Sequence, residues 1–358
     1  MSDQYKDFVG TRSVDEQLRF DLSALETWMR SHVEDFVGGL RVSQFNGGQS
    51  NPTYLLCAGE RRWVLRRKPP GKLLSSAHAV DREYRVITAL AHSGVPVPST
   101  HGLCLDETVI GTAFYLMDYV EGRVFWDTTL PDLPRAERRR VFDEMNRVIA
   151  TLHALDPAVY GLVDFGKPGN YFGRQIERWT RQYRASAAPR IESMERLIEW
   201  LPLNIPPGEE TTVVHGDYRL DNVIFHASEP RILAVLDWEL STLGHPLADF
   251  SYHCLTWHFP LGTFRGFGNA DLASLGIPSE SEYIAAYCRQ IGRGSIDPDQ
   301  WEFCLAYNLF RLAAILHGIM GRVTEGTAAS ARAIEAGMAA SGIAELAWQK
   351  ALRLQNPQ

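Results

Sequence analysis

The sequence predicts an α+β fold of two unequal lobes: a small N-terminal lobe with an antiparallel sheet and a helix, and a larger, mainly helical C-terminal lobe. A chain of 358 residues is long for a single small core. Short apolar runs separated by turn residues dominate before residue 122, and apolar residues at helical spacing dominate after it. The predicted boundaries are 1–117 for the N-terminal arm, first helix and small lobe, 118–122 for a hinge, and 123–358 for the large lobe.

The first lobe is built from a polar arm, a helix and a series of short strands. The arm reaches about Val14, and a helix is expected where apolar residues recur at Leu18, Leu22, Leu25, Trp28 and Met29. Strands are expected at 42–45, 54–57 and 63–66, with glycine-containing turns at 46–52 and 59–60. A helix over 79–92 ends before Gly94, and two more strands, around Leu103 and over 114–117, lead into the hinge.

The second lobe is predicted to be helical, with an apolar helix at its centre. Apolar residues keep helical spacing near 142–152 and again over 171–201. The segment 301–319 is apolar nearly all round, which is typical of a buried helix. Asn308, Arg311 and His317 interrupt it, so we do not expect it to cross a membrane.

Composition restricts the classes of function. The net charge of -7 argues against nucleic acid as the main partner. The five cysteines are scattered, which predicts buried thiols and neither a disulfide framework nor a zinc site. The N-terminus lacks the basic and apolar regions of a signal peptide, so we expect a soluble, cytoplasmic protein without a membrane partner. The sequence carries no signal for an oligomeric state.

The strongest functional signal is His215-Gly216-Asp217 with Asn222 five residues after the aspartate. Two apolar strands follow, at 223–225 and 232–236, and the second ends at Asp237. Phosphoryl transfer from ATP needs an aspartate that accepts the proton of the attacking hydroxyl, and oxygen ligands that hold Mg²⁺. Asp217, Asn222 and Asp237 supply these groups in the required order. The sequence therefore predicts a phosphotransferase that uses ATP and Mg²⁺ and transfers the phosphoryl group to a hydroxyl.

These motifs resemble the aminoglycoside phosphotransferase and choline kinase superfamily, which has a protein-kinase-like fold. His-Gly-Asp-x-x-x-x-Asn stands in place of the His-Arg-Asp of protein kinases, and Asp-Trp-Glu at 237–239 in place of Asp-Phe-Gly. Residues 66–84 are more narrowly similar to the kinase-like domain of acyl-CoA dehydrogenase family members ten and eleven, and the resemblance extends from about Val42 to His258. It implies that Asp217 is the catalytic base and that Asn222 and Asp237 hold Mg²⁺.

Arg219 is a second candidate catalytic residue. It lies two residues after the base, where many protein kinases carry a lysine directed at the transferring phosphoryl group. The alternative is a surface arginine paired with Asp221. For Asp217 itself the alternative is an aspartate at a turn or helix cap.

The predicted nucleotide site departs from the protein-kinase pattern. Backbone and side-chain groups of the turn that holds Gly47, Gly48, Ser50 and Asn51 can cover phosphates, although a plain hairpin is the alternative. Arg66 stands where a lysine is expected to pair with a helix glutamate, here Glu83, and Lys68 is the alternative partner. Backbone groups of Asp118 and Val120 in the hinge are expected to meet adenine.

Several further residues have two interpretations each. Asp249 is expected to brace the catalytic loop, and Glu239 to add to the metal site or orient substrate. His245, His253 and His258 are spaced too irregularly for a metal site, so packing and hydrogen bonding are expected of them. The aromatic segment 256–267 lines either an apolar substrate pocket or the core.

Acceptor choice is the least specified property. The resemblance makes a hydroxyacyl-CoA or hydroxy acid one hypothesis, with Arg67, Lys68 and Lys72 meeting either CoA phosphates or ATP. An aminoglycoside or another small molecule is an alternative acceptor. A nucleotide-binding pseudokinase or scaffold is an alternative from another class, motivated by Arg66 and the unusual glycine turn. A hydrolase lacks a Gly-x-Ser-x-Gly motif to support it.

Overall fold

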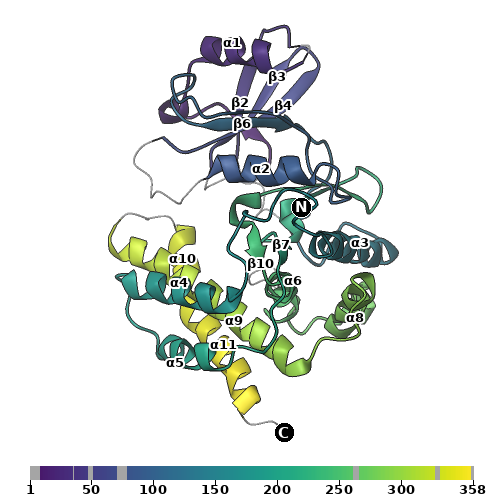
Figure 1. Cartoon of the computed structure of the whole chain (residues 1–358), viewed down its shortest axis with the longest axis vertical. Coiled ribbons are helices and arrows are strands. Elements are labelled where there is room, and N and C mark those ends of the chain that lie inside the picture. The colour runs from purple at the N-terminus through teal and green to yellow at the C-terminus, as the bar shows by residue number, and fades with distance from the viewer. Residues whose placement is uncertain are drawn as a thin grey trace.

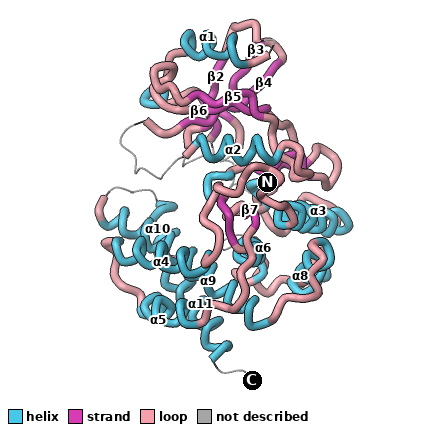
Figure 2. Tube along the Cα trace, in the orientation of Figure 1, coloured by secondary structure: helices cyan, strands magenta, loops and turns pink. Residues whose placement is uncertain are grey.

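The computed structural model describes residues 9–34, 36–46, 51–70, 79–260, 266–326 and 331–355. Strands gather in an upper lobe, and most helices form a larger lower lobe (Figures 1 and 2). In the upper lobe, helix α1 (Leu22–His32) covers the outer face of the sheet. Helix α2 (Val80–Leu90) lies between the sheet and the lower lobe. This is the predicted α+β, protein-kinase-like architecture.

The upper sheet is six-stranded and antiparallel, in the order β1-β2-β3-β4-β6-β5. Its strands are β1 (Thr11–Arg12), β2 (Arg41–Phe45), β3 (Thr53–Ala58), β4 (Arg61–Arg67), β5 (Thr100–Cys104) and β6 (Phe114–Asp118).

Alternation along the strands divides the buried side chains of the upper lobe between its two faces. On β6, Phe114 and Leu116 join the core beneath α1, whereas Tyr115 and Met117 join the core shared with α2 and the lower lobe. On β4, Val64 belongs to the α2 side. Arg66 lies two residues later and therefore also faces α2. The strand period thus decides that Arg66, and not the adjacent Arg67, points into the interlobe region.

The lower lobe consists of helices around two small antiparallel sheets. One sheet pairs β7 (Thr212–Val214) with β10 (Thr242–Gly244), and the other pairs β8 (Val223–Phe225) with β9 (Ile232–Val235). The helices are α3 (Arg135–His153), α4 (Tyr171–Ala185), α5 (Glu192–Trp200), α6 (Pro246–Cys254), α7 (Leu272–Leu275), α8 (Glu280–Gln290), α9 (Pro298–Thr324), α10 (Ala331–Met338) and α11 (Ala340–Gln355).

Helix α9 is longer than the sequence predicted. It has 27 residues, and within the described part of the chain it alone has the length and mean hydropathy, 1.5, of a membrane span. It extends beyond the predicted segment 301–319 at both ends. Of its apolar window, 72% is buried inside the protein. Helices α4, α6, α10 and α11 pack against it, which accounts for its apolar composition.

Two other boundaries differ from the prediction. The polar arm contributes β1, whose Thr11 and Arg12 pair with Phe45 and Gln44, so it is ordered by the sheet edge. The stretch 171–201 forms two helices, because the chain is extended at Ser186 and Ile191. Arg190 Nη1 donates to Tyr183 O there, which helps to satisfy the open carbonyls at the end of α4.

Candidate active site

The catalytic loop lies between the two small sheets of the lower lobe. It leaves β7 at Val214, passes through Asp217, and makes a short 3-10 helix at Leu220–Asn222 before β8 begins. The hairpin β8–β9 then returns the chain to Asp237, and Leu236 N donates to Asn222 O. This backbone bond places the two predicted metal ligands at the same end of the hairpin.

The carboxylate of Asp217 is held by side chains on both oxygens. Asn222 Nδ2 donates to Oδ2 over 3.0 Å, and also to the backbone oxygen of Asp217 over 2.9 Å. Tyr252 Oη donates to Oδ1 over 2.8 Å. The side chain of Asp217 is 16% exposed. A fixed, accessible carboxylate is the geometry that a general base requires.

Arg219 lies beside two carboxylates, one of which is its candidate partner Asp221. Its Nη2 lies 3.1 Å from Asp217 Oδ2 and 3.5 Å from Asp221 Oδ2. Burial lowers the pKa of Arg219, but Asp217 and Asp221 raise it more, so the pKa lies above its ordinary value. Its side chain is 39% exposed. The structure therefore places this cation beside the base, and a contact with the phosphoryl group stays a prediction.

Asp249 braces the catalytic loop from helix α6. Its two oxygens accept the backbone N–H groups of His215 and Gly216 over 2.7 and 2.8 Å, and His153 Nε2 lies 3.1 Å from Oδ2. Burial raises the pKa of Asp249, yet the hydrogen bond and charge of His153 outweigh it, followed by His215, and the pKa lies below its usual value. The expected bracing contact is therefore present.

His215 supports the loop by hydrogen bonding. It is completely buried, and its Nδ1 accepts the N–H of Asp217 over 3.1 Å. The ring proton is then on Nε2, which donates to Leu236 O over 2.8 Å. This ring ties the catalytic loop to the segment that carries Asp237.

A buried arginine joins both lobes at Asp237. Arg66 Nε lies 2.7 Å from Glu83 Oε2, and its Nη2 lies 2.7 Å from Asp237 Oδ1 and 3.5 Å from Glu239 Oε2. Burial lowers the pKa of Arg66, but Glu83 and then Asp237 outweigh it, so the guanidinium stays charged. The expected pair of Arg66 and Glu83 is present, and Glu239 joins it.

The oxygen donors around Asp237 are of the kind that Mg²⁺ prefers. Asp237 has left-handed backbone angles, φ 65° and ψ 56°, and its side chain is 33% exposed. Asn222 uses its nitrogen toward Asp217, which leaves the amide oxygen for another partner. Within the described residues, no three His, Cys, Asp or Glu side chains cluster as a metal site. The donor set fits a magnesium ion held by few protein ligands and by phosphates.

The remaining predicted nucleotide residues are only partly placed. Gly47, Gly48 and Ser50 lie outside the described residues. Asn51 is completely buried, and its Nδ2 donates to Glu83 Oε1 over 2.7 Å. This side chain therefore supports the ion pair, and a direct phosphate contact is not what the structure shows for it.

In the predicted hinge, Asp118 already has partners for its N–H and for its side chain. Asp118 is the last residue of β6, its N–H donates to Ser99 O, and its carboxylate pairs with His101 Nε2 over 2.6 Å. Its N–H is therefore not open to adenine, and a contact between adenine and its backbone oxygen stays a prediction. The role of Val120 stays a prediction.

The structure narrows two interpretations that the sequence left open. Arg67 is 3% exposed, faces the α1 side over Phe20, and burial lowers its pKa, so it cannot meet CoA phosphates. Phe259 and Phe267 are buried, and the partly buried Trp257 packs against Phe267 and Phe142, so the core interpretation of the segment 256–267 holds for these three residues. Residues 261–265 and Lys72 lie outside the described residues.

The three histidines form hydrogen bonds within the fold. His245 Nδ1 accepts Leu247 N–H, His253 lies 2.8 Å from Tyr283 Oη, and His258 lies 2.7 Å from Glu280 Oε1. Burial lowers the pKa of His245 and of His253 to about 4. Both rings are therefore neutral near pH 7.

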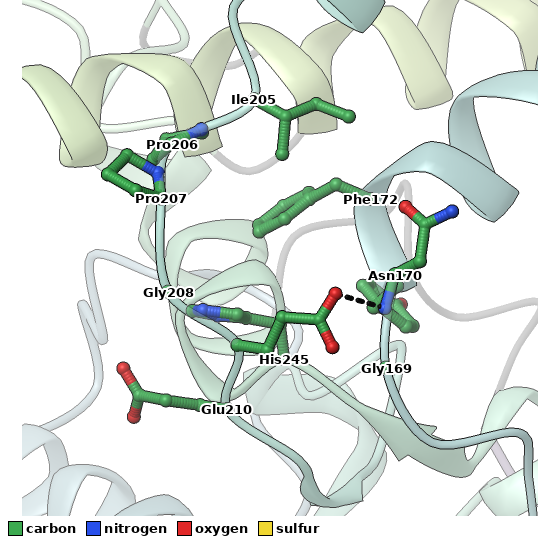
Figure 3. A pocket seen from close by; sticks show the side chains of 11 residues that line it. Gly169, Asn170, Phe172, Ile205, Pro206, Pro207, Gly208, Glu210 and His245 are labelled. Atoms are coloured by element: carbon green, nitrogen blue, oxygen red, sulfur yellow. Dashed lines mark hydrogen bonds between the residues drawn. The ribbon is translucent and has the colours of Figure 1, made fainter.

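A separate pocket of about 230 Å³ lies where α4 begins, beside the loop that precedes β7 (Figure 3). Its two carboxylates already have partners: Glu209 accepts the N–H of Asn170 over 2.7 Å, and Glu210 pairs with Arg293. Its other walls are largely apolar, with Phe172, Ile205, Pro206 and Pro207. Asp217 does not line it.

The sequence matches the phosphotransferase enzyme family over residues 41–302. The chain belongs to this family. It is 45% identical over 346 residues to mouse acyl-CoA dehydrogenase family member 10, covering 96% of this chain and 32% of that protein. It is 41% identical over 319 residues to human acyl-CoA dehydrogenase family member 11, covering 88% of this chain and 41% of that protein. The chain thus spans well under half of these relatives.

Solved structures agree with this assignment of family and fold. A protein from Ralstonia eutropha whose name assigns it to the aminoglycoside phosphotransferases is 54% identical, with a TM-score of 0.87, and the match covers 94% of this chain and 99% of that one. The aminoglycoside phosphotransferase APH(4)-Ia, solved with AMP-PNP and hygromycin B, is 16% identical, with a TM-score of 0.59 and coverage of 92% and 98%. At that identity it shows the fold alone.

Two residues of this phosphotransferase site were missed from the sequence. Tyr252 contacts the base from α6, and Arg311 Nη2 donates to the backbone oxygen of Gly216 over 2.7 Å from α9. The position of Tyr252 three residues after Asp249 places both on one face of a helix. That spacing was a usable signal, whereas Arg311 was recognised only as a polar interruption of an apolar helix.

Proposed function

We propose that the chain transfers the γ-phosphoryl group of ATP to a hydroxyl of a small molecule, with a hydroxyacyl-CoA or hydroxy acid as acceptor. The observation that carries the proposal is the carboxylate of Asp217, held by Asn222 beside the site where Arg66 and Asp237 meet. A base and an anchored acidic ligand at one interlobe site are the parts that phosphoryl transfer needs.

The residues divide the reaction between them. Asp217 accepts the proton of the acceptor hydroxyl as its oxygen attacks the γ-phosphorus, and the bond to the β-phosphate oxygen breaks. Asn222 and Asp237 would hold Mg²⁺, which when bound neutralises phosphate charge. Arg219, 3.1 Å from Asp217, is placed to stabilise negative charge on the transferring group. Arg66 keeps Asp237 oriented through its ion pair.

The acceptor hypothesis rests on relatives and on chemistry. The curated relatives are named as acyl-CoA dehydrogenase family members, and this chain matches a part of each. Phosphorylation turns a hydroxyl into a leaving group, which is a useful step before its removal from an acyl chain. Lys68 follows Arg67, the last residue of β4, and is half-buried. It is therefore a cation still available to a CoA phosphate.

An acceptor screen tests the proposal. MgATP is incubated with the purified protein and 3-hydroxybutyryl-CoA, free 3-hydroxybutyrate or kanamycin, and products are identified by mass spectrometry. We expect phosphorylated hydroxyacyl product with the wild type and at least a hundredfold less with Asp217→Ala, because a general base contributes about 10²–10⁴-fold. Transfer to kanamycin alone would contradict the acceptor class while leaving phosphotransfer standing.

A nucleotide-binding scaffold is a second candidate, favoured by one observation. Arg66 replaces the expected lysine and already engages Asp237 Oδ1, one of the oxygens predicted to face the metal. The two candidates are separated by Mg²⁺-dependent ATP turnover. Turnover abolished by Asp217→Ala, with nucleotide binding retained, supports the enzyme. Binding of ATP without turnover on any acceptor, water included, supports the scaffold.

A further inference from the structure

The two carboxylate oxygens of Asp217 are unequally occupied. Oδ2 faces two donors, Asn222 Nδ2 at 3.0 Å and Arg219 Nη2 at 3.1 Å. Oδ1 faces one, the Tyr252 hydroxyl at 2.8 Å. Each carboxylate oxygen has two lone-pair directions, so the open direction lies on Oδ1. An acceptor hydroxyl that binds Asp217 therefore comes to Oδ1, next to the phenol oxygen of Tyr252.

One turn of helix α6 binds both the backbone of the catalytic loop and the side chain of its base. Asp249 binds the backbone N–H groups of His215 and Gly216, and Tyr252, three residues later, binds the side chain of Asp217. Residues three apart lie on the same helix face, so both contacts depend on the position of α6 relative to the loop. Asn308 of α9 helps to fix the position of α6, because its Nδ2 donates to Ala248 O over 2.8 Å.

Arg311 supports Tyr252 from the far side. Its guanidinium carbon lies 4.8 Å from the centre of the Tyr252 ring and 5.7 Å from that of Trp179. Its Nη2 donates to Gly216 O, the carbonyl immediately before the base. Arg311 is 6% exposed; burial lowers its pKa, but the neighbouring tyrosines, Tyr252 among them, and Asp217 raise it more, so the pKa lies above its ordinary value. A buried cation is costly, and this one lies toward the base and the residues that hold it, which points to a role beyond stability.

We propose that Tyr252 is a positioning residue of the phosphotransfer reaction, which fixes Asp217 Oδ1 toward the acceptor hydroxyl, and that Arg311 holds Tyr252 and the Gly216 carbonyl in place. The inference rests on the proposed function. It assigns the side of Asp217 on which the acceptor binds, and it assigns a role to the buried cation on α9. A rotated carboxylate would meet the hydroxyl with an oxygen that Asn222 and Arg219 already occupy.

Tyr252→Phe removes only the hydroxyl and keeps the ring under Arg311. We expect kcat to fall about 10- to 100-fold, the effect of one hydrogen bond to a charged group, with the Kd for MgATP within twofold of wild type. Rates are measured with water as acceptor and with 3-hydroxybutyryl-CoA. Arg311→Lys keeps a cation but loses the planar contact with the ring, and we expect a smaller fall in kcat of about fivefold to tenfold.

The control is Tyr183→Phe, a buried tyrosine of α4 whose hydroxyl lies 3.3 Å from Ile191 O. It is expected to keep wild-type kcat. In an Asp217→Ala background, Tyr252→Phe should lower the residual rate less than twofold, since a residue that acts through the base has no effect without it. An equal fall in both backgrounds, or unchanged kcat in Tyr252→Phe alone, overturns the inference. A wild type without turnover overturns it together with the proposed function.

Discussion

Arg66 Nε lies 2.7 Å from Glu83 Oε2, while Nη2 of the same guanidinium lies 2.7 Å from Asp237 Oδ1. One side chain of β4 thereby joins helix α2 to the segment after β9. The upper lobe supplies the arginine and the glutamate, and the lower lobe supplies the aspartate. The predicted metal ligand and the position of α2 are therefore coupled through a single buried cation.

Glu83→Ala should destabilise the folded protein and lower its rate of phosphotransfer. The carboxylate of Glu83 also accepts hydrogen bonds from Asn51 Nδ2 and Tyr115 Oη, so its loss leaves buried donors unpaired. We expect the free energy of unfolding to fall by about 3 kcal/mol. The loss is smaller than for a buried arginine with no carboxylate left, because Asp237 still faces Arg66. Urea unfolding measures it.

The matched control for Glu83→Ala is Asp81→Ala, which removes a carboxylate from the same helix outside the ion pair. Its free energy of unfolding should stay within about 0.5 kcal/mol of wild type. If both variants lose the same stability, the effect belongs to the charge or propensity of α2 and not to the contact with Arg66.

The sequence predicted the lobes and the polar residues of the catalytic loop because each leaves a local pattern. The match to the lysine position of kinases selected Arg66, with Lys68 as the alternative, and the spacing from Asp217 selected Asn222. The contacts that hold these residues come from distant elements: Asp249 and Tyr252 from α6, and Arg311 from α9. Whether an aromatic residue packs or binds is decided by such long-range contacts, so the packing of Trp257 against Phe142 could not be read from its neighbours in sequence.

Asp249→Asn tests the brace of the catalytic loop. Asp249 has a pKa below its usual value, so its contribution to stability is present above the unfolded pKa of about 4 and is lost as pH falls through the folded pKa. An asparagine has a single acceptor oxygen, so its NH2 group would face one of the two backbone N–H groups. We expect a loss of about 2–4 kcal/mol at pH 7 and a flatter decline of stability below pH 4.

Measurement of urea unfolding from pH 7 to pH 3 would show the two curves converging at low pH. Parallel curves over that range would mean that Asp249 does not carry the acid-linked part of the stability.

His253 makes the stability of the protein depend on pH in a higher range than Asp249 does. Burial lowers its pKa to about 4, against a hydrogen bond with Tyr218 O that raises it. Between pH 6.5 and 4 the unfolded chain binds a proton that the folded chain does not, so stability falls on acidification, by up to about 3 kcal/mol. His253→Gln should flatten the curve between pH 6.5 and 4. His92→Gln, at an exposed position, should leave the wild-type slope.

Gly216→Ala should damage the loop more than backbone conformation alone explains. Gly216 has φ 83°, and a Cβ there would lie 2.8 Å from Leu240 O. Gly111 has φ 87° with nothing within 4 Å of its Cβ position, so Gly111→Ala isolates the conformational cost of about 1–2 kcal/mol. Gly216→Ala should lose about 2 kcal/mol more in urea unfolding.

The Gly216 backbone also binds Asp249 through its N–H and Arg311 through its carbonyl, so a shift that relieves the contact with Leu240 moves both partners and the adjacent base. Gly216→Ala should therefore lower kcat at least tenfold, while Gly111→Ala keeps it. Equal losses of stability in the two variants would mean that the loop yields to the added methyl group, and then the two hydrogen bonds do not fix Asp217 as tightly as their geometry indicates.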